Sequence, residues 1–107
     1  MISIQDFAKV ELKVGKVLSV EDHPNADKLM IVRVDVGEGE ARTLVAGLRG
    51  HYEKEELDGK LVVIVTNLEP AKLRGIESRG MMLAAQDGEN VVILTLDKPV
   101  KPGSKVL

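Results

Sequence analysis

The chain has 107 residues, of which 44% are hydrophobic, so it can form one small domain with its own core. Its 15 basic and 17 acidic residues give a net charge of -2. Composition alone therefore does not indicate a nucleic-acid-binding protein, which usually has a basic excess. The absence of Cys and the presence of only two His exclude disulfides, thiolate metal sites and Cys nucleophiles, and we expect no metal and no cofactor. The longest apolar runs are too short to span a membrane, and we expect a soluble, cytoplasmic protein.

The chain is predicted to fold into short strands separated by turns. Apolar stretches rich in β-branched residues predict the strands, and clusters of Gly, Pro, Asn and Asp predict the turns. Strands do not alternate with long helices, so a parallel sheet is not expected. In chain order, the prediction is a short helix at residues 3–8, strands at 10–20, 29–36 and 41–46, a short helical segment at 51–57, and strands at 61–65, 81–85 and 91–96.

Local signals refine this prediction. Gly15 interrupts the alternation of the first strand, which predicts a bulge or a sharp bend of the kind that closes small barrels. Residues 67–80 are polar, and an irregular loop is expected there. Pro99 and Pro102 exclude regular structure from the C-terminal extension. Five principal strands with a helical segment between the third and fourth are typical of the all-β OB-fold, a five-stranded barrel, and we predict one such domain over residues 1–107.

An OB-fold usually binds ligands on the face of its second and third strands and in the loops that join strands one to two and four to five. In this sequence those loops are residues 23–28 and 66–80. Charge also changes along the chain, since residues 1–40 hold five basic and eight acidic residues, whereas residues 61–85 hold three and two. The sequence has no phosphate-binding Gly-rich loop, no Ser-nucleophile motif and no HEXXH motif. We therefore expect a binding module without catalytic residues.

The motifs around the two loops resemble those of a known family. Residues 23–29 read HPNADKL, and residues 62–85 read VVIVTNLEPAKLRGIESRGMMLAA. Together with VDVG at 34–37, LVAGL at 44–48 and PGSKV at 102–106, they resemble the tRNA-binding domain family over nearly the whole chain. The resemblance implies an OB-fold that binds tRNA by shape, with little dependence on the anticodon, and that is not itself an enzyme. It also implies a role beside methionyl-tRNA synthetase, as a β subunit or a C-terminal domain, and a homodimer whose interface includes the C-terminal extension.

The second loop carries several candidates for RNA contacts. Gly75 lets the backbone approach a phosphate, and Lys72 and Arg74 on the same loop can neutralise it. Arg79 offers a guanidinium that bonds a phosphate or stacks on a base, and Ser78 offers a hydroxyl. The alternative is that these cations belong to a solvated loop.

Two methionines follow this loop, and they point to opposite faces of the predicted strand, so one of them faces out of the barrel. The family pattern favours Met81 as the methionine that meets RNA, whereas the residues alone leave open a core position for Met81 with Met82 facing out.

The first loop and the neighbouring strands complete the prediction. Asn25 and Asp27 either order the turn or act as ligands, and Lys28 projects beside the second strand. Two arginines on the second and third strands either extend the basic face or pair with Asp35 and Glu40 across the hairpin. The two histidines are predicted to be structural. The full set predicted to contact RNA is Asn25, Asp27, Lys28, Arg33, Arg42, Lys72, Arg74, Ser78, Arg79 and Met81.

Two functions remain open, with tRNA as the partner in the leading one. A single small domain offers few phosphate contacts, so we expect a homodimer that gains avidity from two sites. The other function is a dimerisation or docking scaffold for a synthetase complex, with the methionyl-tRNA synthetase catalytic subunit as partner and RNA affinity secondary. Met1 is followed at once by predicted structure, which favours a separate subunit over a fused domain. Apolar residues near both termini are available for an interface or for packing on their own barrel: Ile2, Ile4, Phe7, Val100, Val106 and Leu107.

Overall fold

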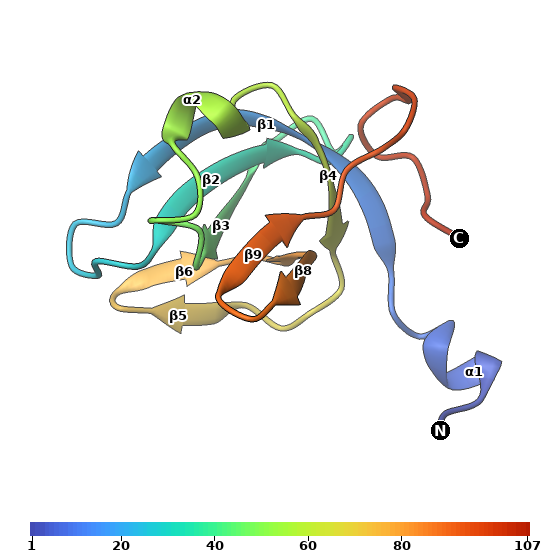
Figure 1. Cartoon of the computed structure of the whole chain (residues 1–107). Helices are drawn as coiled ribbons and strands as arrows, with labels where there is room; N and C mark the ends of the chain where they lie inside the picture. Colours follow the sequence, from blue (N-terminus) through green and yellow to red (C-terminus); the bar gives the residue numbers. More distant parts are fainter.

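Five strands form one antiparallel sheet in the order β3-β2-β1-β4-β7, which curls into a nearly closed barrel in the computed structural model of residues 1–107 (Figure 1). Two hairpins and two four-residue helices complete the fold, and the prediction of an all-β OB-type barrel with short helical segments is confirmed. The elements in chain order are α1 (Ile4–Phe7), β1 (Leu12–Asp22), β2 (Met30–Asp35), β3 (Arg42–Ala46), α2 (Lys54–Leu57), β4 (Leu61–Val65), β5 (Ala71–Leu73), β6 (Ile76–Ser78), β7 (Met81–Met82), β8 (Ala84–Asp87) and β9 (Asn90–Ile93).

The inward face of β2 forms the centre of the core. Met30, Val32, Val34 and Val36 are each at most 2% exposed, as the alternation of the second strand predicts. Burial of one such side chain contributes about 1.5 to 3 kcal/mol to the free energy of unfolding. The same cluster contains Val17, Leu44, Leu48, Leu57, Val62, Ile64 and Ile93, so every long strand and α2 contribute to it.

The irregularity in β1 lies further along the strand than predicted. The register against β2 shifts between Val17 and Ser19, not at Gly15. At Gly15, an added Cβ would lie 3.1 Å from Ile64 Cγ1, so a side chain there would press on Ile64 where β1 packs against β4. β1 pairs with β4 through residues 12–16 and with β2 through residues 16–22, and the bulge lies within the pairing with β2.

The segment predicted as an irregular loop contains a regular hairpin, β5 with β6. Arg74 and Gly75 form its turn with φ values of 51° and 89°, which is the backbone conformation that two-residue hairpin turns favour. The prediction missed the hairpin because its strands have three residues each and lie mostly in solvent. The strand predicted at 81–85 is likewise divided, into β7 on the barrel sheet and β8 in the second hairpin.

Residues 78–80 close the barrel against β3. The Arg79 backbone N–H donates to the Thr43 carbonyl at 2.9 Å, and the Val45 N–H donates to the Ser78 hydroxyl at 2.9 Å. Gly80 has φ 140°, and an added Cβ there would lie 3.1 Å from the Val65 carbonyl oxygen. Glycine therefore allows the chain to pass this close to β4.

The two chain ends behave differently. The C-terminal segment lies along the first half of β1, where Val14 N–H donates to Ser104 and Gly103 N–H donates back to Val14. The N-terminal segment leaves the barrel, and α1 projects into solvent with no buried residue (Figure 1). The N-terminus of this helix is capped, because the Ser3 hydroxyl accepts from the Asp6 N–H at 3.1 Å. No helix in the chain is long and apolar enough to cross a membrane.

Candidate nucleic-acid interface

The β1–β2 loop and the β5–β6 turn meet at the end of the barrel opposite the two termini (Figure 1). A buried imidazole joins them. His23 is 2% exposed, and its Nδ1 accepts from the Asn25 N–H at 3.0 Å. That bond places the ring proton on Nε2, which donates to the Leu73 carbonyl at 3.0 Å. The prediction that this histidine is structural is confirmed, and the two loops predicted to bind RNA are in contact.

Four of the predicted cations around these two loops are exposed and unpaired. Lys28 lies on the β1–β2 loop, Lys72 and Arg74 lie on the β5–β6 hairpin, and Arg79 follows the hairpin. None of their side chains has a carboxylate within 4.0 Å, because all five ion pairs of the structure involve other cations. Their charge is therefore available to an anionic partner such as a phosphate.

The two arginines of β2 and β3 differ from one another. Arg33 is exposed on the outer face of β2 and has no ion pair. Arg42 is not part of a basic face, because its guanidinium bonds both carboxylate oxygens of Glu38 at 2.8 Å and donates to the Thr66 carbonyl at 2.6 Å. The Glu38 carboxylate raises the pKa of Arg42, and the bond from Arg42 lowers the pKa of Glu38. The ion-pair partner is thus Glu38, and the predicted pairing with Glu40 is wrong.

Ser78 also has a different role from the one predicted. Its side chain is buried, accepts from Val45 N–H and donates to the Gly80 carbonyl at 3.1 Å. The hydroxyl therefore both accepts and donates a hydrogen bond inside the protein, which favours a structural role over the predicted contact with RNA. The cause is the closure of the barrel at this position, which the sequence pattern does not reveal.

Met81 faces out of the barrel and Met82 faces in. Met81 is 49% exposed, whereas Met82 is partly buried against the core cluster. Two small hollows lie on either side of Met81, with volumes of about 200 and 210 Å³, and both are lined by Met81 and Val45. Most of the residues that line them are apolar. This surface can accept an apolar or aromatic group, such as the face of an unstacked base.

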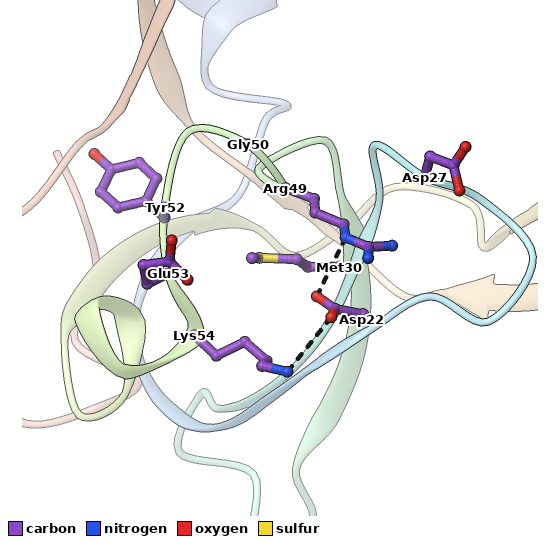
Figure 2. Close-up of a pocket in the computed structure, with 8 residues that line it drawn as sticks. All are labelled: Asp22, Asp27, Met30, Arg49, Gly50, Tyr52, Glu53 and Lys54. Atoms are coloured by element: carbon purple, nitrogen blue, oxygen red, sulfur yellow. Dashed lines mark hydrogen bonds and ion pairs between the residues drawn. The ribbon is translucent and has the colours of Figure 1, made fainter.

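Asn25 and Asp27 lie on the β1–β2 loop, and Asp27 stands at the rim of a polar pocket of about 470 Å³ (Figure 2). Inside this pocket Arg49 and Lys54 point toward Asp22, with Arg49 Nε and Lys54 Nζ at 3.6 and 3.4 Å from its carboxylate oxygens. The prediction missed these two cations because they are far from Asp22 in the sequence. Arg49 lies between β3 and α2, Lys54 begins α2, and the fold brings both to Asp22 at the end of β1.

Comparison with known proteins identifies the family. Residues 12–105 match the family model described as "Putative tRNA binding domain". The methionine–tRNA ligase of Pyrococcus horikoshii is 63% identical over 105 residues, which cover 98% of this chain and 14% of that protein. The methionine–tRNA ligase of Thermotoga maritima is 52% identical over 105 residues, which cover 98% of this chain and 16% of that protein. The chain thus spans about one seventh of the length of the curated relatives it matches.

A solved structure leads to the same conclusion. The MetRS-related protein from Pyrococcus horikoshii superposes with a TM-score of 0.92 at 34% identity, over 100% of this chain and 98% of that protein. The whole barrel and both chain ends are therefore features that this chain shares with its structural neighbour. The chain belongs to the tRNA-binding domain family.

Proposed function

We propose that this chain is a non-catalytic module of residues 1–107 that binds tRNA in the cytoplasm and assists methionyl-tRNA synthetase, as its β subunit or C-terminal domain. The observation that carries the proposal is the group of unpaired cations, Lys28, Lys72, Arg74 and Arg79, on two loops that touch each other. Such a group can hold several phosphates of a folded RNA at once. The partnership with the synthetase is supported by the relatives, which are methionine–tRNA ligases.

The binding mode we propose is recognition of shape. Few side chains at the interface can read bases, because the chain has only two aromatic residues, Phe7 and Tyr52. Phe7 lies on the projecting N-terminal segment, and the Tyr52 hydroxyl accepts from the Ile93 N–H at 3.0 Å. Most contacts are then to phosphates and 2′-hydroxyls, with Met81 and its two hollows taking one unstacked base. Asn25, Asp27 and Arg33 lie at the edge of this interface and contribute polar contacts.

We also propose that the protein acts as a homodimer through the N-terminal arm, residues 1–9, and the C-terminal residues. Ile2, Ile4 and Phe7 are 71%, 73% and 43% exposed, although the root of the arm is held firmly. Asn67 accepts from the Glu11 N–H at 2.8 Å and donates to the Lys9 carbonyl at 2.7 Å. A fixed arm with uncovered apolar side chains is typical of a contact surface for a second chain. The C-terminal segment adds the apolar residues Val100, Val106 and Leu107.

The alternative function is a docking or dimerisation scaffold, which the same apolar arm favours. Fluorescence anisotropy with labelled tRNA distinguishes the two. Under the proposal, several unrelated tRNAs bind with similar affinity, and log affinity falls linearly with log salt concentration. A scaffold would instead associate with the synthetase catalytic subunit but show weak tRNA binding that differs little from its binding to an unrelated RNA hairpin.

A further inference from the structure

One side chain supplies the hydrogen bond that joins the β1–β2 loop to the β5–β6 hairpin. His23 Nε2 and the Leu73 carbonyl form the only hydrogen bond between residues 23–29 and the β5–β6 hairpin. The other polar contacts of this loop are internal, for example His23 N–H to the Leu29 carbonyl at 3.0 Å. At 2% exposure, the imidazole is also among the most buried polar side chains of the protein.

Near its turn the hairpin makes no other hydrogen bond to the barrel, although the Leu73 side chain, which is 38% exposed, lines an apolar hollow with Val45 and Met81. Residues 71–75 are all exposed, and the structure anchors the hairpin to the barrel at its far end, through Ser78 and Arg79. Segments with exposed backbone and few buried contacts open at low cost in free energy. The bond to Leu73 is therefore the only hydrogen bond that holds the turn with Arg74 beside the β1–β2 loop.

We propose that His23 is a positioning residue for RNA binding, which fixes the β5–β6 turn against the β1–β2 loop so that Lys28, Lys72 and Arg74 form one pre-organised phosphate-binding surface. This inference rests on the proposed tRNA-binding function. A pre-organised surface loses less conformational entropy when it binds, and its charges engage the backbone together. His23 contributes to affinity without touching RNA, because it is buried beneath the loop.

Two substitutions separate the two hydrogen bonds of the imidazole. Asn places its side-chain oxygen near the position of Nδ1, so His23→Asn keeps an acceptor for Asn25 but does not reach Leu73. Gln places its amide nitrogen near the position of Nε2, so His23→Gln retains a donor for Leu73. A purely structural requirement for bulk at this site would affect both variants alike.

The first experiment measures tRNA affinity across a salt series for the wild type and both variants, at a temperature where all are folded. We expect His23→Asn to bind about tenfold more weakly, with a slope of log affinity against log salt that is smaller by about 1 for each phosphate no longer bound. We expect His23→Gln to retain most of the wild-type affinity and slope. Equal affinities and slopes for wild type and His23→Asn would overturn the inference, as would equal losses in both variants.

A second measurement tests whether the effect passes through the hairpin. In the wild type, Lys72→Ala and Arg33→Ala should each weaken binding several-fold. In the His23→Asn background, Lys72→Ala should have little further effect, whereas Arg33→Ala on β2 should cost as much as before. Full additivity of His23→Asn with Lys72→Ala would contradict the inference.

Amide hydrogen exchange measured without RNA tests the positioning role of His23 separately from the proposed tRNA binding. The amides of residues 71–78 should exchange faster in His23→Asn than in the wild type or in His23→Gln. If the wild type shows no salt-dependent tRNA binding, the proposed function fails, and the role of His23 in RNA binding fails with it, whatever the exchange rates. If the wild type binds tRNA but exchange in His23→Asn is unchanged, only the positioning role is wrong.

Discussion

The hydroxyl of Ser78 accepts a hydrogen bond from the backbone N–H of Val45 at 2.9 Å, in the place where a carbonyl of a neighbouring strand would normally stand. Ser78 is the last residue of β6 in the hairpin, and the next residue, Arg79, donates its N–H to the Thr43 carbonyl. A side-chain oxygen and a backbone amide thus join β3 to the hairpin and close the barrel. The hairpin that carries the cations is anchored by the same contact.

We predict that Ser78→Ala destabilises the protein. The substitution leaves the Val45 N–H without an acceptor in a part-buried position, and an unsatisfied buried amide costs about 1 to 3 kcal/mol of unfolding free energy. Urea denaturation measures this directly. Ser19→Ala is the matched control, since Ser19 is exposed on β1, and its effect should stay within about 0.5 kcal/mol. Equal stabilities of the two variants would contradict the proposed role of the hydroxyl in closure.

The alternation of residues was enough to predict the barrel, but not its closure. In β2, Val32 and Val34 flank the exposed Arg33, and this period of two is a property of each strand by itself. The bond between Ser78 and Val45 joins residues 33 positions apart, and no local pattern encodes that distance. The β5–β6 hairpin was also not predicted, because its exposed three-residue strands lack the alternation of apolar and polar residues that identifies a strand.

The candidate nucleic-acid interface was likewise predictable where it follows from the order of the strands, and not where it depends on contacts formed in the folded chain. The prediction placed the exposed cations Lys28 and Lys72 in the correct connections between barrel strands, because the order of the connections follows from the order of the strands. The prediction did not identify the ion pair between Arg42 and Glu38, since this pair depends on how far the Gly-rich turn between β2 and β3 folds back. The pairing of Asp22 with Arg49 was also not predicted, because the two residues lie far apart in the sequence.

We predict that Arg74→Asn stabilises the protein and weakens tRNA binding. Arg74 is the only residue other than glycine with a positive φ, at 51°, a conformation that costs L-residues about 1 to 2 kcal/mol but that Asn tolerates. We expect a gain of about 0.5 to 1 kcal/mol in unfolding free energy. The removal of this charge should lower the salt slope of tRNA binding by about 1.

Arg79→Asn is the matched control for this substitution. It removes a charge from the same surface at a position without positive φ, so affinity should fall without a gain in stability. The prediction fails if Arg74→Asn leaves both the melting temperature and the tRNA affinity unchanged.

We predict that the ion pair of Arg42 with Glu38 stabilises the protein at neutral pH and not in acid. The bond from Arg42 lowers the pKa of Glu38, so the folded state binds this proton less tightly than the unfolded state does. The stabilisation is therefore complete above pH 4.5, the ordinary pKa of glutamate, and is lost as the pH falls through the lowered value. Because the Glu38 side chain is 38% exposed, we expect at most about 1 kcal/mol.

Melting temperatures of wild type and Glu38→Gln over a pH series measure this contribution. The two should differ at pH 7 and converge in acid, below the lowered pKa. Glu40→Gln, on an exposed carboxylate without an ion pair, should match the wild type throughout. A difference between wild type and Glu38→Gln that persists unchanged in acid would assign the effect to packing of the side chain instead of its charge.

We predict that alanine substitutions at the two adjacent methionines affect different properties: Met81→Ala weakens tRNA binding, and Met82→Ala lowers the unfolding free energy. Met81 is half exposed between two hollows, so Met81→Ala should weaken tRNA binding, by at most about 1 to 3 kcal/mol if a base stacks there, with an unchanged salt slope. Met82 packs against the core, so Met82→Ala should lower the unfolding free energy by up to about 2 kcal/mol and leave binding by the folded protein intact. Normal tRNA affinity in folded Met81→Ala would remove Met81 from the interface.

The projecting arm allows dimerisation to be tested without disturbing the barrel. Deleting the C-terminal residues is a poor test, because Gly103 and Ser104 hydrogen-bond to Val14 and their removal would expose β1. Phe7→Asp is a better test, since α1 has no buried residue and the barrel does not depend on it.

We expect wild type to sediment as a dimer and Phe7→Asp as a folded monomer, because a charge at an apolar interface is strongly unfavourable. Its tRNA affinity should fall by about a hundredfold or more, since the avidity from a second linked site disappears while each site is intact. Leu18→Asp is the matched control, on an equally exposed leucine of β1 near α2, and should remain dimeric. If the wild type is monomeric at micromolar concentration, or if Phe7→Asp remains dimeric, the exposed arm is not a dimer interface.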